Sequence, residues 1–168
     1  MNKQKLVIVG GGGMVGATAA YACALRSVVE EIVLIDRNAD LVWGQAADIN
    51  DAMGLDRNVE VRAGDYSDIA TDDIVVITAG SPQMPGQTRL ELVGVNANIM
   101  RDIVKNIMAG GAKPYLVVVS NPVDVLTYVA LKESGLPKTR VFGTGTTLDT
   151  SRLKSYLADA LNVDSKAV

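Results

Sequence analysis

Three glycines and one aspartate have a spacing that could support cofactor chemistry. Gly11, Gly13 and Gly16 follow the pattern G-x-G-x-x-G, and Asp36 lies 20 residues beyond the last glycine. In dinucleotide-binding proteins these glycines permit a tight turn, a close approach of the backbone to a pyrophosphate, and packing of a helix on a strand. The helix N-terminus presents unpaired N–H groups to the anion, and the carboxylate accepts hydrogen bonds from the adenosine ribose. Because a carboxylate also repels a 2′-phosphate, the pattern favours NAD over NADP.

A glycine-rich turn between any strand and helix is the alternative interpretation, since G-x-G-x-x-G alone is weakly specific. The neighbouring sequence favours the dinucleotide interpretation. The apolar run 6–9 precedes the glycines, an Ala-rich segment follows them, and a second apolar run, 32–35, ends directly before Asp36.

Apolar runs predict the strands that would position these residues. Four of the first five are near-continuous Val/Ile/Leu runs, which are typical of strands buried on both faces of a parallel sheet. The third alternates apolar with polar residues and is therefore expected at an edge of the sheet. The predicted strands are Leu6–Val9, Ile32–Ile35, Val59–Ala63, Ile74–Thr78, Tyr115–Val119 and Arg140–Phe142.

Helical segments are predicted between these runs. The alternation predicts an α/β fold, a Rossmann-type doubly wound parallel sheet of about six strands with helices on both faces. Ligands of such sheets bind outside the carboxyl ends of the strands. We expect residues 1–168 to form one NAD-binding domain. The predicted helices are Met14–Leu25, Ala39–Met53, Thr88–Ala109, Val123–Ser134 and Thr147–Leu161.

The composition narrows the class of function. The chain has 168 residues, of which 48% are hydrophobic, enough for one domain with a core. The net charge of −3 argues against a nucleic-acid partner. A single cysteine, Cys23, excludes an internal disulfide framework, and no apolar run approaches the ~18 residues of a membrane span. We expect a cytoplasmic protein with neither a membrane partner nor a metal site.

Five sequence blocks resemble motifs of the NAD-dependent L-lactate/malate dehydrogenase family. They are VGGGGMVG, VLID, TAGSPQMPGQTRLELV, SNPVDVLTY and GTGTTLDTSRLK, which follow the family's order and together extend over essentially the whole chain. The resemblance is to the N-terminal cofactor-binding domain and implies NAD as the cofactor. The cofactor-binding positions that it implies are Gly11, Gly13, Met14, Val15, Gly16, Asp36, Thr78, Ala79, Gly80, Asn96 and Asn121.

The resemblance also implies roles for three charged residues. Arg89 would polarise the substrate carbonyl, because negative charge grows on that oxygen as hydride reaches the carbon. Arg152 would bind the substrate carboxylate through its planar guanidinium. Asp149 would orient a catalytic histidine and stabilise its imidazolium. The alternatives are solvated surface arginines and, for Asp149, a helix N-cap.

Two further residues bear on the substrate. Asn121 matches the family residue that contacts the nicotinamide ribose and the substrate, although an Asn-Pro turn before a helix is an alternative. Gln83 matches a lid position that faces the substrate side chain, where malate enzymes have an arginine. A neutral Gln83 would leave a second carboxylate unpaired but would accept the methyl group of pyruvate, so an L-lactate enzyme is predicted. Met84 departs from the family, in which a basic residue is common.

The chain contains no histidine. Reduction of a ketone needs a proton donor near pH 7, and the family uses a histidine that lies beyond the region matched here. We therefore expect a fragment that lacks the substrate domain, binds NAD or NADH, and is inactive alone. Its newly exposed apolar surface should favour oligomers, and the family usually forms tetramers.

Two alternative functions remain: a malate dehydrogenase of the same family, and a stand-alone NAD(H)-binding module without catalysis. Only catalysis needs Arg89, Asp149 and Arg152 together, so their joint presence favours the enzyme.

Overall fold

A single parallel sheet forms the centre of the protein. The computed structural model describes residues 5–54, 59–82 and 84–168. Within these residues the strand order is β3-β2-β1-β4-β5-β6, so the order reverses between the neighbours β1 and β4. This is the arrangement of a Rossmann-type doubly wound sheet, which confirms the predicted fold class. The strands are β1 (Lys5–Val9), β2 (Glu31–Ile35), β3 (Glu60–Ala63), β4 (Ile74–Ile77), β5 (Tyr115–Val118) and β6 (Val141–Gly143).

In the part of the chain that the structure describes, five α-helices and two short 3₁₀ helices connect or follow the strands. Four of the five α-helices have the bounds that the sequence predicted; the fifth, α3, begins one residue later than expected. They are α1 (Met14–Leu25), α2 (Ala39–Met53), α3 (Arg89–Ala109), α4 (Val123–Ser134) and α5 (Thr147–Leu161), with η2 (Tyr66–Asp68) and η3 (Ser165–Ala167) as the 3₁₀ helices.

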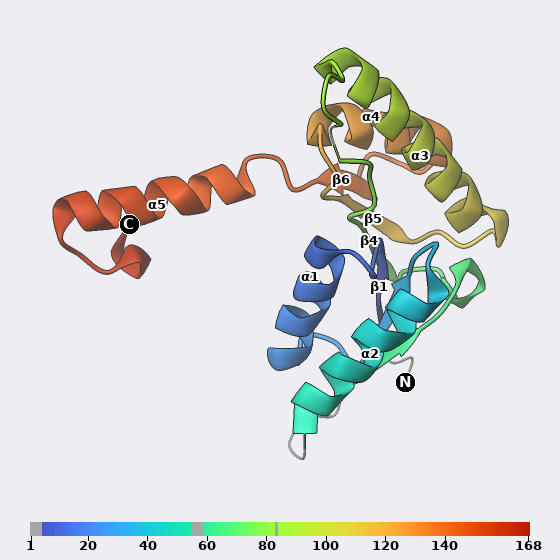
Figure 1. Ribbon diagram of the computed structural model, residues 1–168, viewed down its shortest axis with the longest axis horizontal. Helices are drawn as coiled ribbons and strands as arrows, with labels where there is room; N and C mark the ends of the chain where they lie inside the picture. The colour runs from blue at the N-terminus through green and yellow to red at the C-terminus, as the bar shows by residue number, and fades with distance from the viewer. Residues whose placement is uncertain (1–4, 55–58, 83) are drawn as a thin grey trace.

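Two hydrophobic cores lie on opposite faces of the sheet. Along β1, Val7 and Val9 join the core under α3 and α4, whereas Leu6 and Ile8 join the core under α1 and α2. This division explains the continuous apolar run, because both faces of the strand are buried. Figure 1 shows the two helix pairs on either side of the strands. The alternating strand β3 lies at an edge, as predicted.

Helix α5 does not cover the sheet. It projects away from the rest of the molecule (Figure 1), and its main packing partner is η3. Its only buried residue is Ala158. The apolar side chains of Leu148, Leu153, Tyr156 and Leu161 are each more than half exposed. Helices α1 to α4 therefore cover the two faces of the sheet. Helix α5 instead exposes an apolar surface.

The start of α3 is fixed by a capping box. The hydroxyl of Thr88 accepts a hydrogen bond from the backbone N–H of Glu91 (3.3 Å), and the Glu91 carboxylate accepts one from the backbone N–H of Thr88 (2.8 Å). These two bonds satisfy N–H groups that the first turn of a helix leaves unpaired. Thr88 is thus the N-cap, and the first helical residue is Arg89.

We expect Thr88→Ala to lower the melting temperature by roughly 2–4 °C, because the cap is lost. Thr88→Ser should keep the parental melting temperature, because serine can form the same cap. The hydrogen bonds from Thr88 lower the pKa of Glu91. A lowered pKa stabilises the fold above the ordinary carboxyl pKa, and this contribution is lost as the pH falls through the folded-state value. Thermal unfolding of both variants at neutral and acidic pH checks this: the difference between parent and Thr88→Ala should shrink in acid. An unchanged difference would contradict the role of Glu91.

No helix among the described residues has the length and apolar character that crossing a membrane requires.

Candidate functional site

The carboxyl ends of β1, β2, β4 and β5 meet at one edge of the sheet. The glycine loop after β1 is fixed to the end of β2, since the N–H groups of Gly10 and Gly11 both donate to the carbonyl of Ile35 (2.8 and 3.0 Å). The segment after β4 is fixed to the end of β1 and to the same loop, because the hydroxyl of Thr78 lies within hydrogen-bonding distance of the carbonyls of Val9 (3.1 Å) and Gly10 (3.3 Å). Sequence positions far apart therefore form one continuous surface at this edge.

Glycine is required at Gly10, in this loop, and at Gly16, in the following helix, for different reasons. Gly10 has φ +93°, a conformation that side chains disfavour, and a Cβ there would lie 2.6 Å from the backbone nitrogen of Ala79. Gly16 lies in the first turn of α1, where a Cβ would lie 2.2 Å from the carbonyl oxygen of Gly10. The sequence motif predicted the packing role of Gly16. It missed Gly10, for which the run of four glycines was the available signal.

The N-terminus of α1 is open to an anion. Its N-cap is Gly13, which has no side chain to satisfy the first N–H groups, and its first turn contains no acidic residue. The other four α-helices of the described chain each have an acidic residue in the first turn. No acidic side chain of α1 itself therefore offsets the positive end of its dipole, which favours a bound anion. Met14 and Val15 occupy the first two helical positions with exposed side chains.

Asp36 lies beside the glycine loop, directly after β2. Its carboxylate accepts hydrogen bonds from the N–H of Gly12 (3.2 Å) and of Arg37 (2.7 Å). Tyr66, in η2, is close enough to respond to this charge: burial and, secondarily, the negative charge of Asp36 raise the pKa of its phenol. The sequence reasoning did not identify Tyr66, because its proximity depends on how η2 follows β3.

Asn96 and Ser120 hold the ends of β4 and β5 together. The side chain of Asn96, in α3, is 4% exposed and bonds to the backbone of Ser81 and of Asn121. The hydroxyl of Ser120 donates to the carbonyl of Ala79 (2.6 Å). Asn121 is exposed, and a cis peptide bond joins it to Pro122, the N-cap of α4. A Cβ added at Gly80 would lie 3.5 Å from the amide oxygen of Asn96.

Four of the predicted substrate and catalytic residues lie either away from the strand ends or outside what the structure describes. Gln83 lies outside the described residues, and of Arg89 only its place as the first residue of α3 is described. Asp149 and Arg152 lie on the projecting α5, where both are exposed and form an ion pair of 3.4 Å. The structure therefore does not bring these two residues to the glycine loop.

The alternative that Asp149 is a helix N-cap is wrong. α5 begins at Thr147 with Thr146 as its N-cap, so Asp149 lies inside the first turn. The backbone N–H of Thr150 already donates to the carbonyl of Thr146 (2.8 Å), which places the start of the helix earlier than the aspartate.

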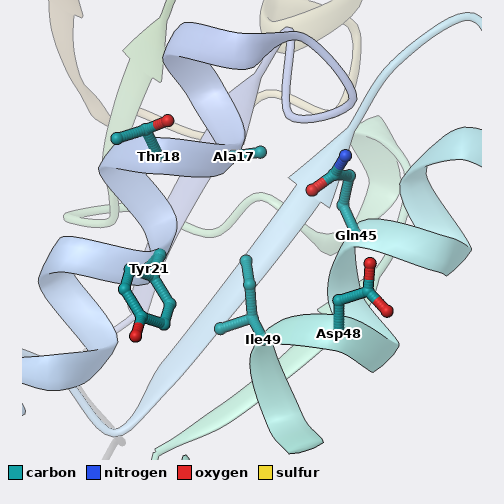
Figure 2. A pocket seen from close by; sticks show the side chains of 6 residues that line it. All are labelled: Ala17, Thr18, Tyr21, Gln45, Asp48 and Ile49. Atoms are coloured by element: carbon teal, nitrogen blue, oxygen red, sulfur yellow. The ribbon is translucent and has the colours of Figure 1, made fainter. Parts of the chain in front are cut away.

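A shallow hollow lies between α1 and α2 (Figure 2). None of the predicted site residues lines it, so we place the candidate site at the strand ends instead. Residues of the two helices face each other across it: Ala17, Thr18 and Tyr21 from α1, and Gln45, Asp48 and Ile49 from α2.

Comparison with known proteins decides the family. Residues 4–143 match the family described as "lactate/malate dehydrogenase, NAD binding domain". The chain belongs to this family. The matched region contains the glycine loop, Asp36 and the ends of β4 and β5, so the strand-end site belongs to a domain that binds NAD. The predicted cofactor and the predicted resemblance are thereby confirmed.

The relatives are L-lactate dehydrogenases. The chain is 50% identical over 169 residues to L-lactate dehydrogenase 2 of Lactococcus lactis subsp. lactis (strain IL1403), covering 100% of this chain and 54% of that protein. It is 45% identical to L-lactate dehydrogenase of Borrelia turicatae (strain 91E135), with the same coverage. The chain thus spans about half the length of the curated relatives that it matches.

Solved structures give the same result. The ligands-bound form of the minor L-lactate dehydrogenase from Enterococcus mundtii is 48% identical, with a TM-score of 0.94 over 99% of this chain and 53% of that one. The ligands-unbound form of that enzyme has a TM-score of 0.84 over 99% of this chain and 52% of the other.

Proposed function

We propose that this chain is the NAD-binding domain of an L-lactate dehydrogenase that interconverts pyruvate and L-lactate. The observation that carries the proposal is the glycine loop held against Asp36 at the uncapped N-terminus of α1. The high identity to L-lactate dehydrogenases along the whole chain supports the choice of enzyme. A substrate domain from outside residues 1–168, a cytoplasmic location and a homo-oligomeric assembly, tetrameric in the family, belong to the same proposal.

The cofactor site follows from the strand ends. The backbone N–H groups of Met14 and Val15 would hold the pyrophosphate, since the first turn of α1 has no side-chain cap and no acidic residue. Asp36 would accept hydrogen bonds from the adenosine ribose. The nicotinamide half would extend along the segment after β4 towards Asn121. The residues of that segment are Thr78, Ala79 and Gly80.

The residues at the N-terminus of α1 leave room for the pyrophosphate of NAD. A Cβ at Gly13 would meet only one atom, the carbonyl oxygen of Gly10 at 3.4 Å, so the space in front of the helix is open. When bound, NADH supplies the hydride and NAD accepts it.

The chain's own residues would polarise and orient the substrate. Arg89 would stabilise the charge that develops on the carbonyl oxygen, and Arg152 would bind the carboxylate. Asp149 would orient the proton-donor histidine, which this chain does not contain. Asp149 and Arg152 would leave their mutual ion pair to do so. Gln83 would face the methyl group of pyruvate and disfavour the second carboxylate of oxaloacetate.

A chimera tests this proposal. The chain replaces the corresponding N-terminal part of the Lactococcus lactis relative, and reduction of pyruvate and oxaloacetate by NADH is measured. We expect pyruvate to be preferred, and Arg89→Gln to lower kcat about 100-fold, because a charge-stabilising donor is lost.

The isolated 168-residue chain is the negative control and should not reduce pyruvate at an enzymatic rate, since it has no histidine. Preference for oxaloacetate would identify the malate enzyme instead. A correctly folded chimera that binds NADH but reduces neither substrate would favour the stand-alone binding module.

A further inference from the structure

Two buried polar residues lie at the ends of β4 and β5. Among the described residues, the buried polar side chains are those of Asn96 (4% exposed) and Ser120 (8% exposed). Burial of an amide or hydroxyl is costly unless its hydrogen bonds are replaced. The hydrogen-bond partners of Asn96 and Ser120 therefore indicate the role of each side chain.

The described side-chain hydrogen bonds of Asn96 go to backbone atoms of two separate segments. Its Oδ1 accepts from the N–H of Ser81 (2.7 Å). Its Nδ2 donates to the carbonyls of Asn121 (3.1 Å) and Ser81 (3.4 Å). Both amide protons are thus engaged within the protein. The side chain joins the segment after β4 to the segment after β5.

These hydrogen bonds also fix one end of the 81–88 loop. The loop leaves β4 at Ser81 and enters α3 at Arg89, and Asn96 lies seven residues further along that helix, about 10 Å. Asn96, which lies in the helix that follows the loop, therefore fixes Ser81, the residue at which the loop begins. The start of the loop is fixed, whereas Pro82, Met84 and Pro85 beyond it are exposed.

Ser120 provides a second connection at the same place. Its hydroxyl lies within hydrogen-bonding distance of the carbonyls of Ala79 (2.6 Å) and Ile77 (3.2 Å). The connections of Ser120 and Asn96 all lie on the β4–β5 side of the sheet. Asp36 and the glycine loop lie on the β1–β2 side.

We propose that Asn96 is a positioning residue for the nicotinamide half of the cofactor, which acts by holding the backbone of Ser81 and Asn121 together. This inference rests on the proposed function, in which Asn121 faces the nicotinamide ribose. The adenosine half depends on Asp36 and the glycine loop, to which Asn96 makes no described bond. Loss of Asn96 should therefore weaken binding of NADH more than binding of ADP-ribose, which lacks the nicotinamide.

The test compares NADH and ADP-ribose on three proteins by calorimetry: the parent chain, Asn96→Asp and Asn98→Asp. Asn96→Asp keeps the size and the acceptor but places a carboxylate against two carbonyl oxygens. Asn98→Asp makes the same chemical change at an exposed position of the same helix. Thermal unfolding of each protein verifies the fold.

We expect Asn96→Asp to weaken NADH binding about tenfold and to leave ADP-ribose binding within about twofold of the parent, as loss of a buried hydrogen bond implies. The enhanced fluorescence of bound NADH should fall as well, because the nicotinamide is less ordered. Asn98→Asp should change neither ligand. If Asn96→Asp does not fold, Ser120→Ala should show a smaller change in the same direction.

An equal loss for both ligands, or no loss for either, would overturn the inference. Equal affinities of the parent chain for NADH and ADP-ribose would overturn it too, because the nicotinamide end would then contribute nothing. Failure of the parent to bind either ligand would instead contradict the proposed function.

Discussion

Gly16→Ala is expected to abolish measurable NADH binding and to lower the melting temperature of the chain. The new Cβ would lie 2.2 Å from the carbonyl oxygen of Gly10 and 2.9 Å from the hydroxyl of Thr78. Neither atom can move freely. The Gly10 oxygen belongs to the backbone of a tight turn in which Gly10 has φ +93°, and the Thr78 hydroxyl donates to the carbonyl of Val9. Relief requires α1 to move away from the loop. We expect a cost of about 1–3 kcal/mol and at least a 100-fold loss of affinity.

Two other glycines serve as controls for this variant. A Cβ at Gly44, in α2, meets no atom within 4 Å, so Gly44→Ala should preserve binding and slightly raise stability. Gly13→Ala should keep the fold, because its only close contact is at 3.4 Å, yet weaken binding by blocking the pyrophosphate. Circular dichroism and calorimetry of the three variants check these outcomes. A Gly16→Ala protein with parental stability and affinity would show that the close packing is not required.

Asp36→Ala is expected to weaken NADH binding by about 10- to 100-fold and to reduce the discrimination against NADPH. The carboxylate accepts from the N–H of Gly12, so its removal loses both a ribose acceptor and a support of the glycine loop. The repulsion of a 2′-phosphate disappears with the charge, and the exposed Arg37 stands next in the chain to attract it.

Asp40→Ala is the matched control, because it removes an exposed negative charge from the first turn of α2. It should leave the ratio of NADH to NADPH affinity unchanged. Titration of both variants with both cofactors measures this ratio. If Asp36→Ala retains the parental ratio, then Asp36 does not determine the choice of cofactor.

The elements of the fold could be predicted because their signals are local. Continuous apolar runs identified the buried strands, and glycine marked the ends of helices, as at Gly135, which has φ +63° directly after α4. The prediction ended β4 at Thr78 and β5 at Val119, one residue later in each case than in the structure. The N–H groups of both still donate to neighbouring strand carbonyls, so these residues continue the ladder beyond the assigned strands.

The candidate site was predictable only in part. The glycine loop and Asp36 lie within one strand–helix–strand unit, so spacing alone identified them. The bonds of Asn96 join residues 15 and 25 positions away and depend on how α3 packs on the sheet. Helical periodicity predicted the bounds of α5 but not that it projects from the sheet (Figure 1), so the position of Asp149 and Arg152 could not be predicted either.

Isothermal titration of the 168-residue chain with NADH, and with NADPH as the control, measures directly whether the strand ends bind NAD. We expect one NADH site of micromolar affinity and much weaker NADPH binding, because the glycine loop, the N-terminus of α1 and Asp36 are already in place. Binding of neither cofactor, or equal binding of both, would contradict the claim that these strand ends form a working NAD site.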